Sequence, residues 1–532
     1  MTSIIKKKQL FCWIYVVLLS SAFLGKSADI YVSQSGTGDG TTSSNASSLA
    51  WLNSNWSSIN AGDTVHLVGT LTNTLAIGKS GAAGSPITLF FEPNAKFSAP
   101  AWGSPASDNF TADPIVQGGG VSTLNYFIID GGSNGLITST SNGMGQSFSN
   151  SCVGLVLTAC GMGVEIRNLT VTNMYYRITG AANDFGCGNG IEMSGTVTNC
   201  SIHNCTVINA GNAFAIYYEP GISSNLQIYS NAAYHISWGC VLAPQQNNAT
   251  CVNSSIWANR FDHFEDYAGN PGNHQDGIIC YTALATQTNR NLQIYRNLIG
   301  PHISTNQTTA AVFINDTQAI GSFQNVLIYD NIFMIQDGDL WGNGFVAVDG
   351  NPSCVFNNTF VETGILQGGI CFHTGSFGNA SFMNNLALNV NTVLAQGIGA
   401  PAGFQPTIIT NSDYNVVFSP GCDWWNPGSF TWGGGTSYRD HVTYPQFANF
   451  DNHSSINQPL LNANYQPLTN DTVVINAGIN LSSFFAVDFN GNPRPATGPW
   501  TIGAFQTTGA ASTLQTVSPP SIISIGPGPA TP

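Results

Sequence analysis

A short segment that recurs through the middle of the chain constrains its fold more than any other feature. The best copies read Ile294-Tyr-Arg-Asn297, Ile328-Tyr-Asp-Asn331 and Val355-Phe-Asn-Asn358. Successive copies are 27 to 38 residues apart, a period typical of solenoids, in which each repeat forms one coil. The asparagines that end the copies are Asn168, Asn204, Asn231, Asn259, Asn297, Asn331, Asn358 and Asn385.

A second series of short apolar segments alternates with the first. It includes Gly190-Ile-Glu-Met193, Gly239-Cys-Val-Leu242 and Gly277-Ile-Ile-Cys280. β-Branched, aromatic and apolar residues bounded by Gly, Asn, Ser or Thr are typical of strands, and helical periodicity is nearly absent. Two strand-like segments per period predict an all-β, right-handed parallel β-helix. We expect the repeated asparagines to be structural, with their amides bonded to the backbone of adjacent coils.

Three stretches carry a resemblance to a known group of proteins. They are the opening Ile30-Tyr-Val-Ser-Gln-Ser-Gly36, the repeats, and the closing Asp488-Phe-Asn-Gly-Asn-Pro-Arg-Pro495 with Ile502-Gly-Ala-Phe505. Together they cover most of residues 29–506 and resemble the pectate-lyase-like superfamily of secreted β-helix proteins. Thr501 and Gln506 stand where that closing motif usually has Asp and Glu. The resemblance implies a carbohydrate-active protein but no particular reaction, because this fold carries lyases, hydrolases, epimerases and adhesins.

The two ends of the chain differ from the repeats. Lys6 to Lys8 precede an apolar run from Leu10 to Leu24, and this order is typical of a secretory signal. The run is shorter than the roughly 20 residues that span a bilayer, so we expect a secreted protein without membrane contact. The predicted organisation is a signal peptide over 1–28, the β-helix over 29–400, C-terminal coils with an irregular aromatic-rich cap over 401–506, and a flexible tail over 507–532.

Charged residues make up only 8% of the chain, with 13 Lys+Arg against 27 Asp+Glu. So few cations exclude a surface that follows nucleic-acid phosphates, and we expect a monomer whose partner is a polysaccharide. Eleven cysteines remain after Cys12 leaves with the signal, without a CxxC pair or a zinc-like Cys/His spacing. We expect most of them to be buried thiols, and one or two disulfides stay open.

The charges concentrate in one place. Four carboxylates and two histidines lie between residues 262 and 276, within the longest step of the repeat, 38 residues. Crowding of this kind is usually retained for a cation, a substrate or proton transfer. The cluster consists of Asp262, His263, Glu265, Asp266, His274 and Asp276.

Strand alternation predicts a groove beside this cluster. If Ile278 points inward, then Ile279 and Tyr281 point outward, and the same rule exposes Glu192, Tyr217, Asn315 and His373 on other coils. Asp262, His263 and Asp266 are expected to hang over the groove from a loop. The predicted catalytic residues are Asp276 as acid or base, Asp266 or Glu192 as its partner and His274 as the orienting group. The predicted substrate contacts are Asp262, His263, Tyr217, Tyr281, Arg260 and Asn315.

Three functions stay open. The clustered carboxylates and the absence of lysine after Lys96 favour a glycoside hydrolase, in which two carboxyl groups act and no cofactor is needed. The first alternative is a Ca²⁺-assisted lyase or epimerase of a uronate polymer that uses Arg260 or Arg290, with carboxylates of the cluster as hard ligands. The second is a non-catalytic carbohydrate-binding adhesin. His203, His235 and His302 have no acidic neighbours in the sequence and are expected to be structural.

Overall fold

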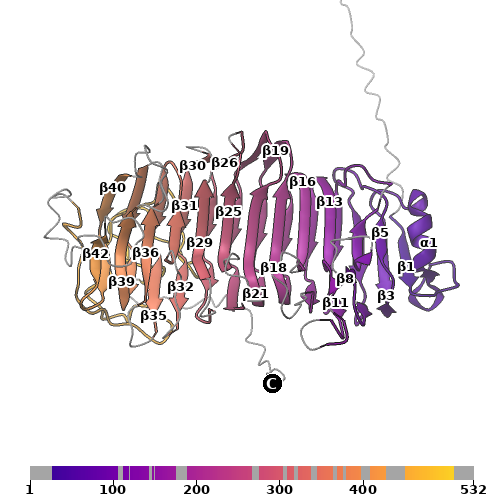
Figure 1. Cartoon of the computed structure of the whole chain (residues 1–532), viewed down its shortest axis with the longest axis horizontal. Coiled ribbons are helices and arrows are strands. Elements are labelled where there is room, and N and C mark those ends of the chain that lie inside the picture. The colour runs from indigo at the N-terminus through magenta and orange to yellow at the C-terminus, as the bar shows by residue number, and fades with distance from the viewer. Residues whose placement is uncertain are drawn as a thin grey trace, which may run out of the picture.

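The chain forms an elongated right-handed parallel β-helix, in which coils stack along one axis from the N-terminal end (Figure 1). A short helix, α1 (Leu49–Ser54), lies at that end together with two 3-10 turns, Ser43–Asn45 and Trp56–Ser58. The computed structural model describes residues 27–105, 112–118, 120–142, 146–148, 150–174, 188–265, 275–284, 286–303, 308–316, 322–336, 344–363, 368–374, 379–396, 408–426 and 450–507.

One face of the solenoid is a 14-stranded sheet whose strands pair in parallel, coil after coil. In spatial order its strands are β2 (Ser47–Ser48), β1 (Asp29–Ser33), β3 (Thr64–Val68), β6 (Ile87–Phe91), β10 (Phe127–Asp130), β14 (Val164–Arg167), β17 (Ser201–His203), β20 (Gln227–Tyr229), β23 (Ser255–Trp257), β27 (Gln293–Tyr295), β31 (Val326–Tyr329), β34 (Ser353–Phe356), β37 (Asn379–Met383) and β40 (Ile408–Asp413).

The remaining faces are joined into a 26-stranded sheet, because long strands such as β18 and β21 continue around a corner from one face to the next. A separate antiparallel pair is formed by β8 (Ser104–Pro105) and β12 (Asn150–Ser151). The strands of the large sheet are, in chain order, β4 (Thr70–Leu71), β5 (Leu75–Ile77), β7 (Lys96–Ala99), β9 (Ile115–Gln117), β11 (Leu136–Ser139), β13 (Leu155–Met162), β15 (Thr170–Thr172), β16 (Ile191–Thr198), β18 (Thr206–Tyr218), β19 (Gly221–Ser224), β21 (Ala232–Pro244), β22 (Ala249–Val252), β24 (Arg260–Phe264), β25 (Gln275–Thr282), β26 (Thr288–Arg290), β28 (Leu298–Ile299), β29 (Thr308–Asp316), β30 (Phe323–Gln324), β32 (Ile332–Ile335), β33 (Val346–Val348), β35 (Thr359–Glu362), β36 (Gly368–Thr374), β38 (Leu386–Leu388), β39 (Val390–Gln396), β41 (Val416–Phe418) and β42 (Asp423–Asn426).

Alternate residues of each short strand point into the solenoid and stack on their counterparts in the next coil. Ile256, Ile294 and Ile328 pair in register and are fully buried. Parallel strands occur almost only where the faces of the sheet are covered, and here the stacked apolar side chains cover the inner face. The fold prediction made from the two alternating series is therefore confirmed.

A ladder of buried asparagines runs along one corner. Asn259, for example, donates its Nδ2 to Ile228 O at 3.0 Å and to Asn297 Oδ1 at 3.0 Å, and its backbone N–H also donates to Asn297 Oδ1. The same pattern repeats on successive coils, as expected from the sequence. The rungs are Asn231, Asn259, Asn297, Asn331, Asn358, Asn385 and Asn415.

Two asparagines of the predicted series are not rungs of this ladder. Asn168 and Asn204 occupy the preceding position, where the backbone is left-handed with φ of 57° and 53°. Cys205 therefore takes the first place of the ladder, and its backbone N–H donates to Asn231 Oδ1 at 3.0 Å. Asparagine is frequent in left-handed positions. The left-handed position and the ladder position that follows it therefore both favour asparagine, and the sequence pattern does not distinguish them.

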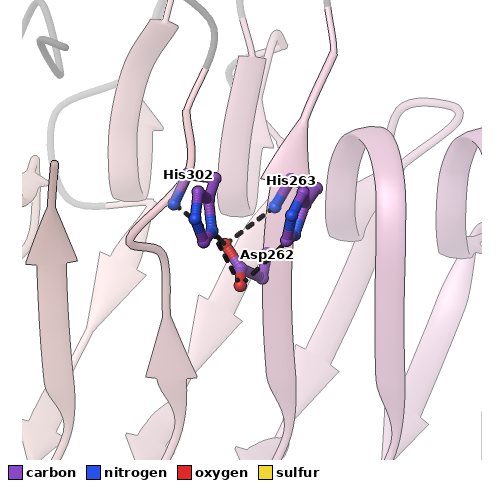
Figure 2. A group of neighbouring side chains, drawn as sticks. All are labelled: Asp262, His263 and His302. Carbon is purple, nitrogen blue, oxygen red and sulfur yellow. Dashed lines mark hydrogen bonds and ion pairs between the residues drawn. The ribbon is translucent and has the colours of Figure 1, made fainter. Parts of the chain in front are cut away.

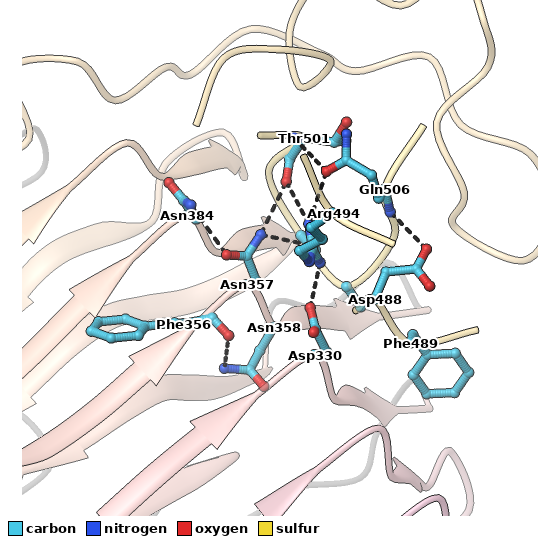
Figure 3. A network of polar contacts seen from close by, with 12 residues as sticks. Asp330, Phe356, Asn357, Asn358, Asn384, Asp488, Phe489, Arg494, Thr501 and Gln506 are labelled. Carbon is cyan, nitrogen blue, oxygen red and sulfur yellow. Dashed lines mark hydrogen bonds and ion pairs between the residues drawn. The ribbon is translucent and has the colours of Figure 1, made fainter. Parts of the chain in front are cut away.

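The segment 450–507 lies along the outside of the solenoid. Its residues Leu481, Phe485 and Trp500 pack with Tyr329 and Phe356 of the 14-stranded sheet. Figure 3 shows the polar network beneath it, which centres on Arg494 and Asp330. Both side chains are fully buried. The closing motif thus fastens a returning segment onto coils formed more than 100 residues earlier.

The described cysteines match the expectation of buried thiols. Ten of them are free, and all except the half-buried Cys354 are buried. Burial raises the pKa of Cys251 to about 11, so its thiol stays protonated and unreactive. In the part of the chain that the structure describes, no helix combines the length and apolarity needed to cross a membrane.

Candidate functional site

The described residues of the predicted groove do point out of the solenoid, but several of them are buried. Glu192 is in register with Ala215, and the row continues through Val241 and Ile279 to Phe313. These apolar members form a cluster separate from the core, with Tyr217, Trp238 and Tyr281 packed against it. The alternation was therefore assigned correctly, whereas the expected exposure of Glu192 and His373 is wrong, since both are buried.

The two described carboxylates that were predicted to be catalytic each accept a hydrogen bond. Asp276 is fully buried in β25 and accepts the backbone N–H of Ala310 at 3.1 Å. Glu192 is buried in β16 and accepts Nδ2 of Asn189 at 2.6 Å. Asn315 lies in β29, directly beside Tyr281. The catalytic roles predicted for Asp276 and Glu192 stay predictions.

Tyr217 lies close to Glu192 and Tyr281 on this face. Burial raises the pKa of the Tyr217 hydroxyl, and the negative charge of Glu192 raises it further. A hydroxyl of this kind stays protonated and acts as a hydrogen-bond donor. Asp266 and His274, the other two predicted catalytic residues, lie outside the described residues.

Asp262, His263 and His302 form a cluster of three potential metal ligands, with one ligand atom of each residue within 4.8 Å of the others (Figure 2). His302 Nδ1 lies 3.1 and 3.3 Å from the two oxygens of the Asp262 carboxylate, and His263 Nδ1 lies 3.4 Å from Oδ2. The imidazole rings of His263 and His302 stack with centroids 4.1 Å apart. Figure 2 shows them on neighbouring coils, with the carboxylate between them.

The local backbone explains why these groups converge. Asp262 and His263 belong to β24 and do not hang from a loop, contrary to the expectation. His263 and its neighbour His235 have left-handed φ values of 54° and 55°, in a corner column that Asn173 and Asn209 occupy on earlier coils. This corner therefore places residues of successive coils beside one another.

The corner forms a row of three imidazoles. His235 and His263 have ring centroids 5.0 Å apart, and His302 follows on the other side of His263. His235 Nδ1 lies 2.7 Å from Glu265 Oε1. We call His235, His263 and His302, with Asp262 and Glu265, the histidine row.

The electrostatics of the histidine row follow from its burial. The Asp262 side chain is only 2% exposed, and burial alone would raise the pKa of its carboxyl. The nearby His263 imidazole and the backbone N–H groups of His302 and His263, which donate to the carboxylate, outweigh that effect, so the pKa of Asp262 lies below its ordinary value. In return, Asp262 raises the pKa of His263. Arg260 Nη2, 3.9 Å from Asp262 Oδ2, adds a further positive charge.

Sequence reasoning missed His235 and His302, because their acidic partners lie 30 and 40 residues away. The repeat did hold the signal. His235 and His263 come four residues after the ladder asparagines Asn231 and Asn259, and His302 comes five after Asn297. Residues at the same offset in successive coils stack, so His235 and His263 could have been placed together, whereas His302 lies one position beyond that offset.

Comparisons with known proteins add little to this geometry. No family model and no curated protein matches the chain. Among solved structures, XylC in complex with xylose aligns over 90% of this chain and 98% of its own at 10% identity and a TM-score of 0.45. The pectate lyase Pel9A aligns over 91% and 98% at 14% identity and a TM-score of 0.39. The A-module of the Azotobacter vinelandii mannuronan C-5 epimerase AlgE6 aligns over 69% and 89% at 12% identity and a TM-score of 0.41. Similarities at this level bear on neither substrate nor reaction.

Proposed function

We propose that the chain acts on an acidic polysaccharide and abstracts the proton α to a uronate carboxylate, the step common to lyases and epimerases. The observation that carries the proposal is the histidine row, where three imidazoles and Arg260 surround two carboxylates. In a chain with 13 Lys+Arg and 9 His in total, this is a strong local concentration of potential cations. Such groups suit an anionic sugar.

His235 is the proposed base. Its Nδ1 is bonded to Glu265, which fixes the tautomer and leaves the lone pair on Nε2. The side chain is 36% exposed, so a substrate can approach it. A base held by a carboxylate in this way is the usual arrangement for histidine in proton transfer.

Arg260, His263 and His302 form the proposed binding site for the uronate carboxylate. When the C–H bond breaks, the electron pair moves into that carboxylate, and positive charge beside it stabilises the intermediate. The pair then expels the sugar oxygen on the β carbon to leave a double bond, or takes a proton on the opposite face to invert the centre. The first outcome is a lyase and the second an epimerase.

Hydrolysis, the function preferred from the sequence, is supported less well by the described residues. A glycosidase needs two carboxyl groups on either side of the scissile bond. Here Asp262 and Glu265 are each bonded to imidazoles, and Asp276 and Glu192 are buried. The histidine row thus suits an anionic sugar and a general base better than a pair of catalytic carboxyl groups.

The test is deuterium incorporation α to the carboxylate, followed by NMR on a panel of uronate polymers in heavy water, together with the ultraviolet absorbance of unsaturated product. We expect exchange with wild-type protein and its loss in His235→Asn, a substitution that the corner tolerates because Asn209 has the same backbone conformation. His453→Asn is the matched control, since His453 makes a similar exposed pair with Asp413 at 2.8 Å. Reducing ends produced without exchange or absorbance would refute the proposal in favour of hydrolysis.

A further inference from the structure

We propose that Asp262, His263 and His302 bind a divalent transition-metal ion of the Zn²⁺ type. The inference rests on the proposed function only for the metal's role, which is to supply the positive charge beside the uronate carboxylate. Metal binding itself can be measured without a substrate.

The distances between the three ligand atoms support this site. Two ligand atoms bound about 2.1 Å from one tetrahedral ion lie about 3.4 Å apart. Asp262 Oδ2 lies 3.3 Å from His302 Nδ1 and 3.4 Å from His263 Nδ1, and one ligand atom of each residue lies within 4.8 Å of the others. Because the two imidazoles are stacked, their rings would have to turn to direct both Nδ1 lone pairs at one ion.

A second observation concerns His263. Its Nδ1 is buried, and although it lies at ion-pair distance from Asp262, it has no hydrogen-bond partner. Buried polar atoms are normally satisfied. A metal on the side of the ring that faces Asp262 would satisfy this nitrogen and replace the weak contact.

The donor set identifies the class of metal. Two imidazole nitrogens and one carboxylate oxygen suit Zn²⁺ and its neighbours, whereas Ca²⁺ prefers oxygen ligands only. The Ca²⁺ site expected under the lyase alternative shares only Asp262 with this site, and it stays a prediction. Three protein ligands leave a fourth position open, and His302, 45% exposed, lies on the solvent side of the cluster. The open position is where a substrate carboxylate would bind.

His235 is not one of these ligands, because its Nδ1 is bonded to Glu265. The row then divides into a metal-binding part and a base. This division predicts that His235→Asn removes proton transfer and keeps the metal, whereas His263→Asn removes the metal.

The experiment measures Zn²⁺ binding by calorimetry, and Co²⁺ binding by visible absorbance, on the full chain after dialysis against a chelator. We expect one ion per chain, and a loss of affinity of more than about 100-fold in His263→Asn and His302→Asn, beyond what losing an outer-shell partner costs. His235→Asn should change the affinity by less than about 10-fold. Thermal unfolding of each metal-free variant checks that the fold is kept.

Three results would overturn the inference: no stoichiometric binding by the folded wild-type chain, binding unaffected by both His263→Asn and His302→Asn, or displacement of Co²⁺ by an equal concentration of Ca²⁺. Failure of this inference is distinguishable from failure of the proposed function. A chain that exchanges the α proton but binds no Zn²⁺ refutes only the metal site. A chain that binds Zn²⁺ through these residues but exchanges no proton refutes only the function.

Discussion

Removal of Arg494 should detach the C-terminal segment 450–507 from the solenoid. Arg494 pairs with Asp330, and its other donors reach Thr501 O, Gly503 O and Gln506 Oε1 (Figure 3). Its guanidinium also lies 5.1 Å from the ring centroid of Trp500. One side chain therefore connects the segment's own turns to a coil that lies 164 residues earlier.

The magnitude follows from the burial of both partners. In Arg494→Met, the fully buried Asp330 loses its cation, and breaking one side of such a pair costs about 3–5 kcal/mol. That cost corresponds to a rise of about 10²- to 10⁴-fold in the opening equilibrium of the segment. Adding Asp330→Asn should recover part of the loss because no buried charge remains. Asparagine suits the left-handed backbone at this position, as Asn357 and Asn384 show on the next coils.

The assay is hydrogen–deuterium exchange read by mass spectrometry. The amide of Gly503 donates to Asn384 O and that of Ala504 to Thr359 Oγ1, so both report docking of the segment. Peptides from the central coils provide an internal reference. Arg296→Met is the matched control, since Arg296 is half-buried and makes one bond to the segment, to Phe489 O at 2.8 Å, worth about 1 kcal/mol.

Two results would refute this reasoning. If Arg494→Met accelerates exchange at Gly503 and Ala504 no more than Arg296→Met does, the buried ion pair stabilises the docked segment no more than a single hydrogen bond does. If Asp330→Asn makes the Arg494→Met chain exchange faster, an uncompensated carboxylate is not the source of the loss.

Three further predictions concern stability and catalysis. Asn297→Ala should lower the urea midpoint of unfolding, because Ile256 O and the backbone N–H of Asn259 lose their hydrogen bonds, at a cost of about 1–3 kcal/mol each. Asn225→Gly, in an exposed ladder of side-chain amides, should change that midpoint little. Burial opposes ionisation of Asp130, but hydrogen bonds from Asn168, Gly132 N–H and Arg167 hold its pKa below the ordinary value of 3.8. The stabilisation from this carboxylate is therefore present above pH 3.8 and is lost as the pH falls through the lowered pKa. The thermal midpoint of Asp130→Asn should accordingly change less with acidification than that of the wild-type chain. Asp276→Asn should retain turnover, measured as α-deuterium exchange, and a complete loss would restore Asp276 as a catalytic residue.

Much of the fold was predictable because the solenoid repeats its own constraints. Inward stacking selects the same apolar type at Ile256, Ile294 and Ile328, and the ladder selects asparagine on each coil. A single sequence of this fold therefore shows the same residue preference at several equivalent positions. The position of segment 450–507 was not predictable in this way, because the contact between Arg494 and Asp330 occurs once and crosses 164 residues.

The site was only partly predictable for the same reason. Asp262 and His263 were found because their charges are close in the sequence, while His302 comes from the next coil. Outward direction was predicted correctly for Glu192 and Tyr217, but not burial. Alternation fixes which way a side chain points, whereas burial depends on neighbours such as Phe313 and Val241, which form an apolar cluster outside the core.

The fold explains why the chain can carry so few charged residues. At the corner of the histidine row, uncharged side-chain amides bond from coil to coil, as in the pair Asn209 Nδ2 to Asn173 Oδ1 at 2.8 Å. At the same corner, on the next two coils, His235 and His263 keep the left-handed backbone but replace the amide with an imidazole. The fold does not require that change, since asparagine already meets its needs there. A residue that departs from the structural repeat without a structural reason is best explained by chemistry, and this departure is what locates the proposed site in the histidine row.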